Sequence, residues 1–287
     1  MKLIDVLSLS FVVFLWSSTF TIIKLGIQEV PPITLSFLRY LIALPFLFVF
    51  TFLQNRKAFG KLVLKNWRVF VLLGLTGITL QNLLQNVGIQ YTTASDASLI
   101  IAINPVFISL FSHFYLKEKA TSRLIIGVAL ALFGIIFVTK PLEWSLHPME
   151  VIGDLLCLGS AISWALYSML GRKTLSESGT NEMTSYSMAF GTLFLLPAAF
   201  IFEKPTIYTS ITAVSMILYL GLLCSALAYL LWNRALKEVP ATKAGSFLFF
   251  IPVVSVAIAH FVLFEPLDIF FIIGTLLVMA GVAITEL

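Results

Sequence analysis

Ten long apolar runs, separated by short polar breaks, make up most of this 287-residue chain. They fall at about 4–25, 32–53, 68–89, 95–116, 122–139, 150–171, 184–202, 212–234, 240–263 and 267–285. About 20 apolar residues in a helix cross a hydrocarbon core roughly 30 Å thick. The runs lack the alternation of strands, and an open sheet edge in lipid would leave backbone groups unpaired. The pattern predicts an all-α polytopic membrane protein with ten transmembrane helices.

Composition argues against an ordinary soluble enzyme. Hydrophobic residues make up 59% of the chain and charged residues 11%, whereas soluble domains have about 45–50% and about 25%. The net charge of +4 is not a nucleic-acid footprint, so no nucleic-acid partner is expected. Cys157 and Cys224 lie inside apolar runs, where cysteine packs as a small buried side chain. The lipid bilayer is the expected environment.

Positive charge is distributed unevenly between the two sides of the predicted bundle. Fourteen of the 18 Lys and Arg residues lie in alternate breaks or at the N-terminus, all on one side. The other side has Lys24, Lys140 and Lys204, and Arg39 lies inside the second run. Because Lys and Arg favour cytoplasmic loops, both termini are predicted to be cytoplasmic.

The chain matches itself when it is shifted by 147 residues. The matched pairs are Gly74–Gly221, Asn86–Asn233, Ala94–Ala241, Ala97–Ala244, Pro105–Pro252, His113–His260, Glu118–Glu265, Gly127–Gly274 and Gly134–Gly281, with Trp16–Trp164 at a shift of 148. This register predicts two five-helix repeats, at 1–145 and 146–287. Because five is odd, the second repeat must cross the membrane in the opposite sense. Inverted repeats are typical of secondary transporters, whose substrate site lies near the midplane between the repeats.

Polar side chains interrupt several spans. The third span holds Gln81, Asn82, Gln85 and Asn86, and residues four apart share a helix face. Single amides can join transmembrane helices, but four together favour the lining of a cavity. Gln81, Gln85 and Asn86 are therefore candidate substrate-binding residues.

Aromatic and polar residues recur in the middle of other spans. The candidates for substrate binding are Trp16 and Thr19 in the first run, Trp164 and Tyr167 in the sixth, and Tyr229, Trp232 and Asn233 in the eighth. A tryptophan at mid-span lies outside the interfacial belt, and its indole N–H needs a partner. A wet cavity or a polar substrate would supply one, and core packing is the alternative. Such a cavity would suit a small amphipathic or zwitterionic solute.

Arg39 lies too deep in the second run to reach the headgroups easily. It either fixes the bundle by pairing with helix-end carbonyls or with Glu29 or Asp96, or it binds a substrate carboxylate. Its counterpart in the second half falls near Gly191, so the charge is not duplicated.

Prolines and glycines punctuate the matched spans. Pro105 and Pro252 each remove a backbone hydrogen bond and predict kinks near the middle of the fourth and ninth helices. Broken helices at matching positions point to a transporter's binding site. The glycines one heptad apart predict close helix packing; they are Gly127, Gly134, Gly274 and Gly281.

Two matched His–Glu pairs lie near the ends of the same helices, on opposite sides. His113 precedes Glu118 by five residues, as His260 precedes Glu265. These side chains are candidates for proton transfer or gating, and hydrogen bonding at helix ends is the alternative. The scattered acids and histidines predict neither a metal site nor a cofactor.

As a set, these features resemble the drug/metabolite transporter superfamily, and more narrowly the EamA-like permeases. The residues that carry the resemblance are Trp16, Arg39, Ala43, Pro105 with Glu118, Pro252 with Glu265, and the four paired glycines. The resemblance covers essentially the whole chain. It implies a multi-pass permease of the cell inner (plasma) membrane that exports amino acids or related metabolites. It also implies a central cavity lined by the first, third, fourth, sixth, eighth and ninth helices.

The leading hypothesis is a secondary transporter for a small-molecule substrate, working by alternating access as a monomer or homodimer. A flippase for a lipid-linked sugar or amphiphile is the alternative. An intramembrane enzyme is a further one, but no nucleophile elbow, His-Glu-x-x-His motif or phosphate loop occurs in the sequence. No catalytic residues are therefore predicted.

Overall fold

The computed structural model describes residues 3–54, 60–104, 106–108, 110–111, 122–139, 148–177, 180–204, 210–238, 247–248, 250–267 and 269–286. Every regular element in these ranges is helical, which confirms the predicted all-α class. Six helices of the described part are long and apolar enough to cross a membrane, and four further apolar helices are shorter.

The helices follow the apolar runs in order. They are α1 (Leu3–Gly26), α2 (Pro32–Gln54), α3 (Lys61–Gly74), η1 (Leu75–Leu80), α4 (Gln81–Tyr91), α5 (Ala94–Ile101), α7 (Ser122–Thr139), α8 (Pro148–Glu177), α9 (Thr180–Phe202), α10 (Ile211–Leu218), η3 (Tyr219–Leu227), α11 (Ala228–Glu238), α13 (Phe250–Leu263) and α14 (Ile269–Glu286). The third span starts earlier than the apolar run because its first turns contain polar residues such as Lys61 and Asn66.

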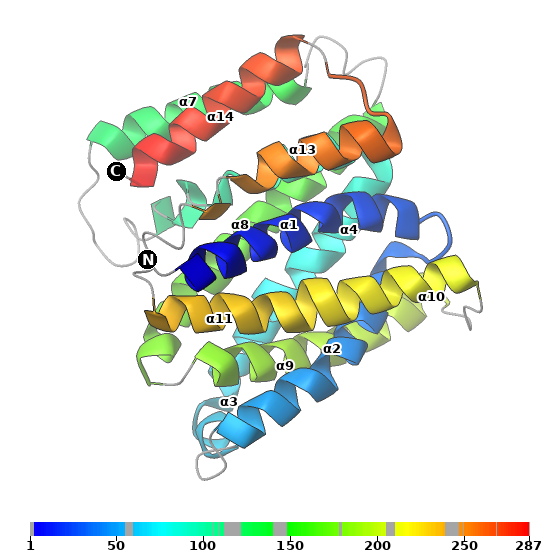
Figure 1. Cartoon of the computed structure of the whole chain (residues 1–287), viewed down its shortest axis with the longest axis vertical. Coiled ribbons are helices and arrows are strands. Elements are labelled where there is room, and N and C mark those ends of the chain that lie inside the picture. Colours follow the sequence, from blue (N-terminus) through cyan, green and yellow to red (C-terminus); the bar gives the residue numbers. More distant parts are fainter. Residues whose placement is uncertain are drawn as a thin grey trace.

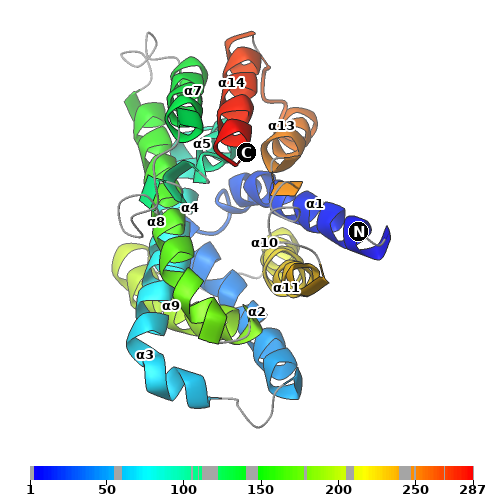
Figure 2. The ribbon, with the colours of Figure 1, turned by 90° about the vertical axis from the view of Figure 1, so that its left-hand side faces the viewer.

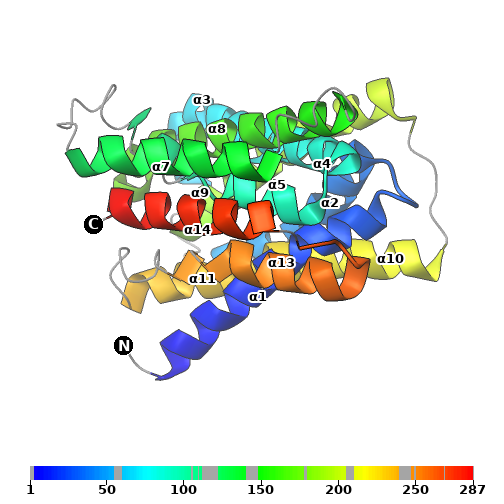
Figure 3. The same cartoon turned by 90° about the horizontal axis from the view of Figure 1, so that it is seen from above.

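The helices lie side by side in one bundle. Helices α7 and α14 form a pair at one edge, α2, α3 and α9 lie at the opposite edge, and α1 passes between them (Figures 1 and 2). Helix α1 begins and α14 ends at the same end of the bundle (Figures 1 and 3).

Two of the spans change from α-helix to π-helix and back. The π-segments are η1 and η3, and each joins two α-helices without a break. A π-turn shifts backbone hydrogen bonds from i−4 to i−5 and is frequent at functional sites. The hydroxyl of Ser225 follows this shift and donates to the carbonyl of Leu220 (2.9 Å).

The bundle is apolar outside, and its interior buries polar as well as apolar side chains. Phe200 and Phe261 are 62% and 77% exposed, whereas Ser17 and Asn86 are fully buried. A protein folding in water would invert this distribution, because exposed aromatic surface is unfavourable there. An apolar outer surface suits lipid, and polar groups in a membrane bundle face its interior.

Glycines set the spacing between α7 and α14. A Cβ on Gly134 would lie 2.7 Å from the backbone nitrogen of Val278, and one on Gly281 would lie 2.6 Å from that of Ala131. The two backbones therefore touch, which confirms that these glycines serve close helix packing.

Charged side chains bind helix ends at the end of the bundle opposite the start of α1. Lys24 donates to the carbonyls of Ile89 (2.7 Å) and Thr92 at the end of α4. Glu203, after α9, accepts from backbone N–H groups at the start of α2, including that of Thr34 (2.6 Å). Each charge has the sign that the helix dipole favours at that terminus.

Candidate functional site

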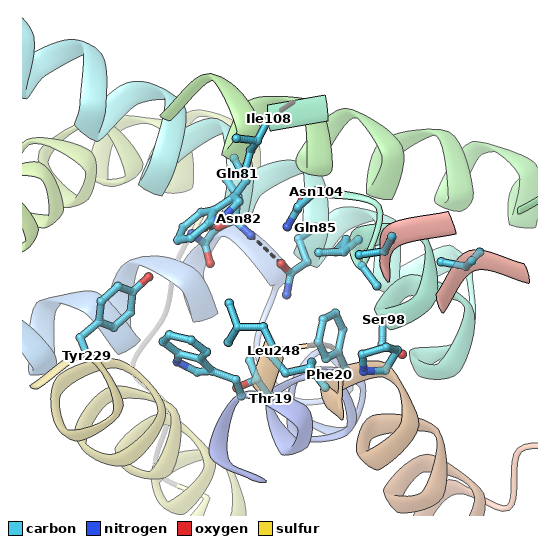
Figure 4. Close-up of a pocket in the computed structure, with 18 of the residues that line it drawn as sticks. Thr19, Phe20, Gln81, Asn82, Gln85, Ser98, Asn104, Ile108, Tyr229 and Leu248 are labelled. Atoms are coloured by element: carbon cyan, nitrogen blue, oxygen red, sulfur yellow. Dashed lines mark hydrogen bonds between the residues drawn. The ribbon is translucent and has the colours of Figure 1, made fainter. Parts of the chain in front are cut away.

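A central cavity of about 240 Å³ lies within the bundle (Figure 4). Its walls come from α1, α2, α4, α5, α8, α11, α13 and α14, with further residues from the segments that follow α5 and precede α13. Seven of the side chains predicted to bind substrate line it: Trp16, Thr19, Arg39, Gln81, Gln85, Trp164 and Tyr229. The cavity approaches the roughly 300–1,000 Å³ of sites for drug-sized ligands, so it suits a smaller molecule.

Amide side chains form a hydrogen-bonded chain along one wall. Tyr40 donates its hydroxyl to Asn82 Oδ1 (2.8 Å), and Asn82 Nδ2 donates to Gln81 Oε1 (2.5 Å). Gln81 Nε2 in turn donates to Gln85 Oε1 (2.6 Å). The chain leaves the amide nitrogen of Gln85 pointing into the cavity, as Figure 4 shows. Because each amide orients the next, the wall ends in a fixed hydrogen-bond donor.

Among the described residues that line the cavity, Arg39 is the one with a charged side chain. Its side chain is only 4% exposed. The Nε atom donates to the hydroxyl of Ser225 in η3 (3.0 Å), and the guanidinium lies 4.9 Å from the ring centre of Tyr40. Within the described ranges its hydrogen-bond partner is thus a hydroxyl and not a carboxylate.

Trp16 lines the cavity, but its indole N–H forms a hydrogen bond within the protein. Nε1 donates to the carbonyl of Cys224 (3.2 Å), which lies in the π-helical segment η3. The ring also contacts Tyr229 and Trp232, with centroids 5.7 and 5.5 Å away. The expectation that a solute or water satisfies this N–H is therefore wrong, because a backbone carbonyl accepts its hydrogen bond.

Three other predicted binding residues lie in packed positions outside the cavity lining. Asn86 is fully buried and donates to Ser36 Oγ (2.7 Å), which ties α4 to the first turn of α2. Tyr167 packs on Gly77 so closely that a Cβ there would lie 2.2 Å from its ring. Trp232 packs with Trp16 and a small cluster around Leu9 and Ala235. The side chain of Asn233 falls outside the described residues.

The predicted proline kinks stay predictions. Pro252 lines the cavity from α13, and residues 247, 248 and 250 before it are also helical. Pro105 lies outside the described residues.

The two described candidates for proton transfer, His260 and Glu265, contact backbone groups and do not line the cavity. Glu265 accepts from the N–H groups of Ala94 (2.8 Å) and Ser95 (3.0 Å) and so caps α5. His260 Nδ1 is 2.8 Å from the carbonyl oxygen of Glu265. These contacts favour the helix-end alternative for this pair. Their counterparts His113 and Glu118 lie outside the described residues, and in the described part no group of three His, Cys, Asp or Glu residues could hold a metal ion.

Several lining residues were not predicted individually. They include Phe20, Tyr40, Ser98, Asn104 and Met279. Asn104 is the most informative, because its buried Oδ1 has no hydrogen-bond partner among the described residues. Its signal in the sequence is an amide inside an apolar span, next to a proline.

The fold and the cavity define a class of protein: a helical membrane protein with a ligand-sized central cavity, whose largely apolar walls carry a few polar side chains. The EamA-like transporter family model matches the chain twice, over residues 3–140 and 151–287. The chain therefore belongs to the EamA-like transporter family, within the drug/metabolite transporter superfamily.

Individual relatives support this membership. An uncharacterized transporter from Archaeoglobus fulgidus is 32% identical over 97% of this chain and 96% of that protein. A probable terminal-alkyne amino-acid exporter from Streptantibioticus cattleyicolor is 28% identical over 93% of this chain and 88% of that protein. A chain known from a crystal structure superposes with a TM-score of 0.67 at 20% identity, covering 99% of this chain and 96% of that one. That likeness shows the same fold.

Proposed function

We propose that this protein is a secondary transporter that exports small polar or amphipathic metabolites, such as amino acids, by alternating access. Its ten helices form two inverted repeats, residues 1–145 and 146–287. The observation that carries the proposal is the central cavity, which combines a buried cation, amides and aromatic rings from both halves. We propose no enzymatic step, and the named relatives are transporters.

Helix contacts support the repeat. A shift of 147 or 148 residues relates α1 to α8 and α4 to α11. In agreement with this relation, α1 packs on α11 as α8 packs on α4. Likewise, α2 packs on η3 as α9 packs on η1, and η1 and η3 themselves occupy related positions. The pairs α2–α9 and α7–α14 then lie across the pseudo-two-fold axis.

Glycine contacts support the same register and favour Ser187, not Gly191, as the counterpart of Arg39. A Cβ on Gly221 would lie 2.8 Å from the carbonyl oxygen of Arg39, and one on Gly74 would lie 2.7 Å from that of Ser187. Gly74 and Gly221 are a matched pair, so Ser187 corresponds to Arg39. This counterpart lies one helical turn before Gly191, and the position that matches Arg39 carries no charge.

Alternating access follows from the inversion. When one repeat adopts the conformation of the other, the cavity closes at one end and opens at the other. The contacts of Lys24, Glu203 and Glu265 with helix ends would hold one end closed, and they must break for that end to open.

The expected location is the cell inner (plasma) membrane with both termini cytoplasmic. Positive charge in the loops supports this orientation. The start of α1 and the end of α14 also share one end of the bundle. A C-terminal reporter that is active only in the cytoplasm should be active, and activity of a periplasm-specific reporter at that position would refute the orientation.

The test of transport is counterflow in proteoliposomes with labelled amino acids, nucleosides, sugars and cationic drugs. The unsubstituted protein is compared with a Trp16→Ala, Gln85→Ala double variant. The control is a Trp67→Ala, Gln28→Ala double variant, which removes the same residue types from exposed positions. Saturable exchange of one solute class, lost in the cavity variant and kept in the control, is the expected result.

Two other results would change the proposal. Exchange that survives in the cavity variant would place the binding site elsewhere in a functioning transporter. Absence of exchange with every soluble compound would favour a lipid-linked sugar or amphiphile as substrate, to be tested by lipid translocation in the same liposomes.

A further inference from the structure

Arg39 is a buried cation whose charge has no acidic partner in the described part of the chain. It is 4% exposed, and its hydrogen bond there goes to the neutral hydroxyl of Ser225. A buried charge without a counter-ion is costly, and ionisable groups inside membrane bundles are retained for function or pairing. The charge faces a cavity, so a solute can supply the counter-ion.

Among the described residues, Arg39 forms a side-chain hydrogen bond through Nε and none through its two terminal nitrogens. Ser225 donates to the carbonyl of Leu220, so its oxygen is oriented to accept from Arg39 Nε. The ring of Tyr40 packs near the guanidinium, 4.9 Å from centre to Cζ. A guanidinium has five N–H donors, and Nε uses one of them. The two terminal nitrogens, with four donors, form the fork that matches a carboxylate.

The rest of the cavity complements a carboxylate on a small molecule. Gln85 adds a second donor, its amide nitrogen, which points into the cavity (Figure 4). Asn104 offers the opposite polarity, because its buried Oδ1 is an acceptor without a partner in the described part of the chain. Trp16 and Tyr229 supply aromatic faces for an apolar or cationic part of the solute. None of the described lining residues is acidic.

Resting on the transport function proposed above, the geometry points to a carboxylate subsite at Arg39. The substrate class is then a small carboxylate or a zwitterion whose carboxylate binds Arg39 and Gln85. An ammonium group, where present, binds Asn104 and the aromatic faces. Neutral sugars and cations lacking a carboxylate fall outside this class.

The first test needs no known substrate. In the ligand-free protein, Arg39→Gln removes an uncompensated charge, so its melting temperature should equal or exceed that of the unsubstituted protein. A structural anchor would give the opposite result, a melting temperature lower by several degrees. Arg68→Gln is the matched control, because Arg68 is exposed and stacks on Trp67. A clear destabilisation by Arg39→Gln alone would overturn the subsite.

The second test compares acids with their carboxamides. The probes are leucine, phenylalanine and threonine, each beside its amide, which keeps the ammonium and loses the carboxylate. At least one acid should exchange in proteoliposomes at least about tenfold faster than its amide, a ratio equivalent to 1.4 kcal/mol. Arg39→Gln should abolish this preference, and Arg39→Lys should restore part of it, because lysine keeps the charge without the fork.

The outcomes separate this inference from the transport function. Exchange of amides and acids at equal rates, unaffected by Arg39→Gln, would overturn the subsite and leave a transporter. Exchange of sugars, nucleosides or cationic drugs at the same rate in the unsubstituted protein and in the Arg39 variants would also overturn the subsite and leave a transporter. No exchange of any soluble probe by the unsubstituted protein would count against the proposed transport function itself.

Discussion

The α7–α14 interface and the central cavity use the proposed repeat in opposite ways. At the interface both halves contribute the same residue: Gly134 lies against α14 as Gly281 lies against α7. At the cavity several matched positions differ: Gln85 of α4 corresponds to Trp232 of α11, and Arg39 corresponds to Ser187 in the proposed register. Trp16 and Trp164 are an exception, because they match and both line the cavity. The frame, meaning the residues that pack or join helices, is repeated where backbones must touch, whereas the cation and the amides that would bind a solute are not repeated.

This difference has a physical cause. A contact between two related helices across a two-fold axis is made by the same residues on both sides, so selection for close packing acts on both copies. A small solute bound on that axis has no two-fold symmetry, so its carboxylate needs a cation on one side only. Divergence between matched polar positions of the cavity therefore points to residues that would contact the solute, while the matched Trp16 and Trp164 supply an aromatic ring from each half.

The largest expected effect comes from filling the α7–α14 interface. Gly134→Ala places a Cβ 2.7 Å from a backbone nitrogen and 2.8 Å from a backbone oxygen of α14. The helices must separate, at a cost of about 2–3 kcal/mol, and thermal unfolding in detergent should show a markedly lower melting temperature. Gly159→Ala is the control, because its new Cβ meets only the side-chain end of Leu84, at 3.3 Å. Equal melting temperatures for both variants would refute backbone contact as the basis of this interface.

A neighbouring pair on α4 tests the comparison inside one helix. Gln85 faces the cavity and diverges from Trp232, whereas Asn86 bonds to α2 and matches an asparagine, Asn233. Gln85→Leu should slow exchange about tenfold by removing a cavity donor. Asn86→Leu should change exchange less than about twofold, and it should lower stability by about 1 kcal/mol through two lost interhelical bonds. If Asn86→Leu slowed exchange and Gln85→Leu mainly lowered stability, differences between matched positions would not identify the binding site.

More of the fold than of the candidate site could be predicted from the amino-acid sequence. Periodicity and length predicted the helices, since a membrane span has to be long and apolar. The side of each amide was not predictable: Gln81 and Gln85 face the cavity, but Asn86 turns to α2. The π-segments explain part of this, because one extra residue per turn rotates every later side chain and has no local sequence signature. The partner of the Trp16 indole, a carbonyl 208 residues away, required the tertiary structure.

A smaller effect is expected at the cap of α5. Glu265→Gln keeps one acceptor oxygen but loses the charge and the second acceptor for the N–H groups of Ala94 and Ser95. The loss should be about 1 kcal/mol, with the pH profile of exchange unchanged, because Glu265 is assigned to the frame. Glu29→Gln, at an exposed position, is the control. A shift in the pH profile of exchange in Glu265→Gln would instead support a role of this carboxylate in proton transfer.

The smallest effect is expected at Tyr167. The sequence predicted it as a substrate-binding residue, but in the structure it packs between helices outside the cavity lining. Its ring packs on Gly77 and lies 5.1 Å from that of Trp164, the aromatic residue that does line the cavity. Tyr167→Phe keeps the packed ring and removes only the hydroxyl, so exchange and stability should change by less than about 0.5 kcal/mol. Trp164→Phe replaces a lining side chain with a smaller one and so enlarges the cavity. It should measurably change the substrate concentration that gives half-maximal exchange. If Tyr167→Phe slowed exchange as much as Trp164→Phe, Tyr167 would belong to the binding site, and the site would extend one helical turn further along α8.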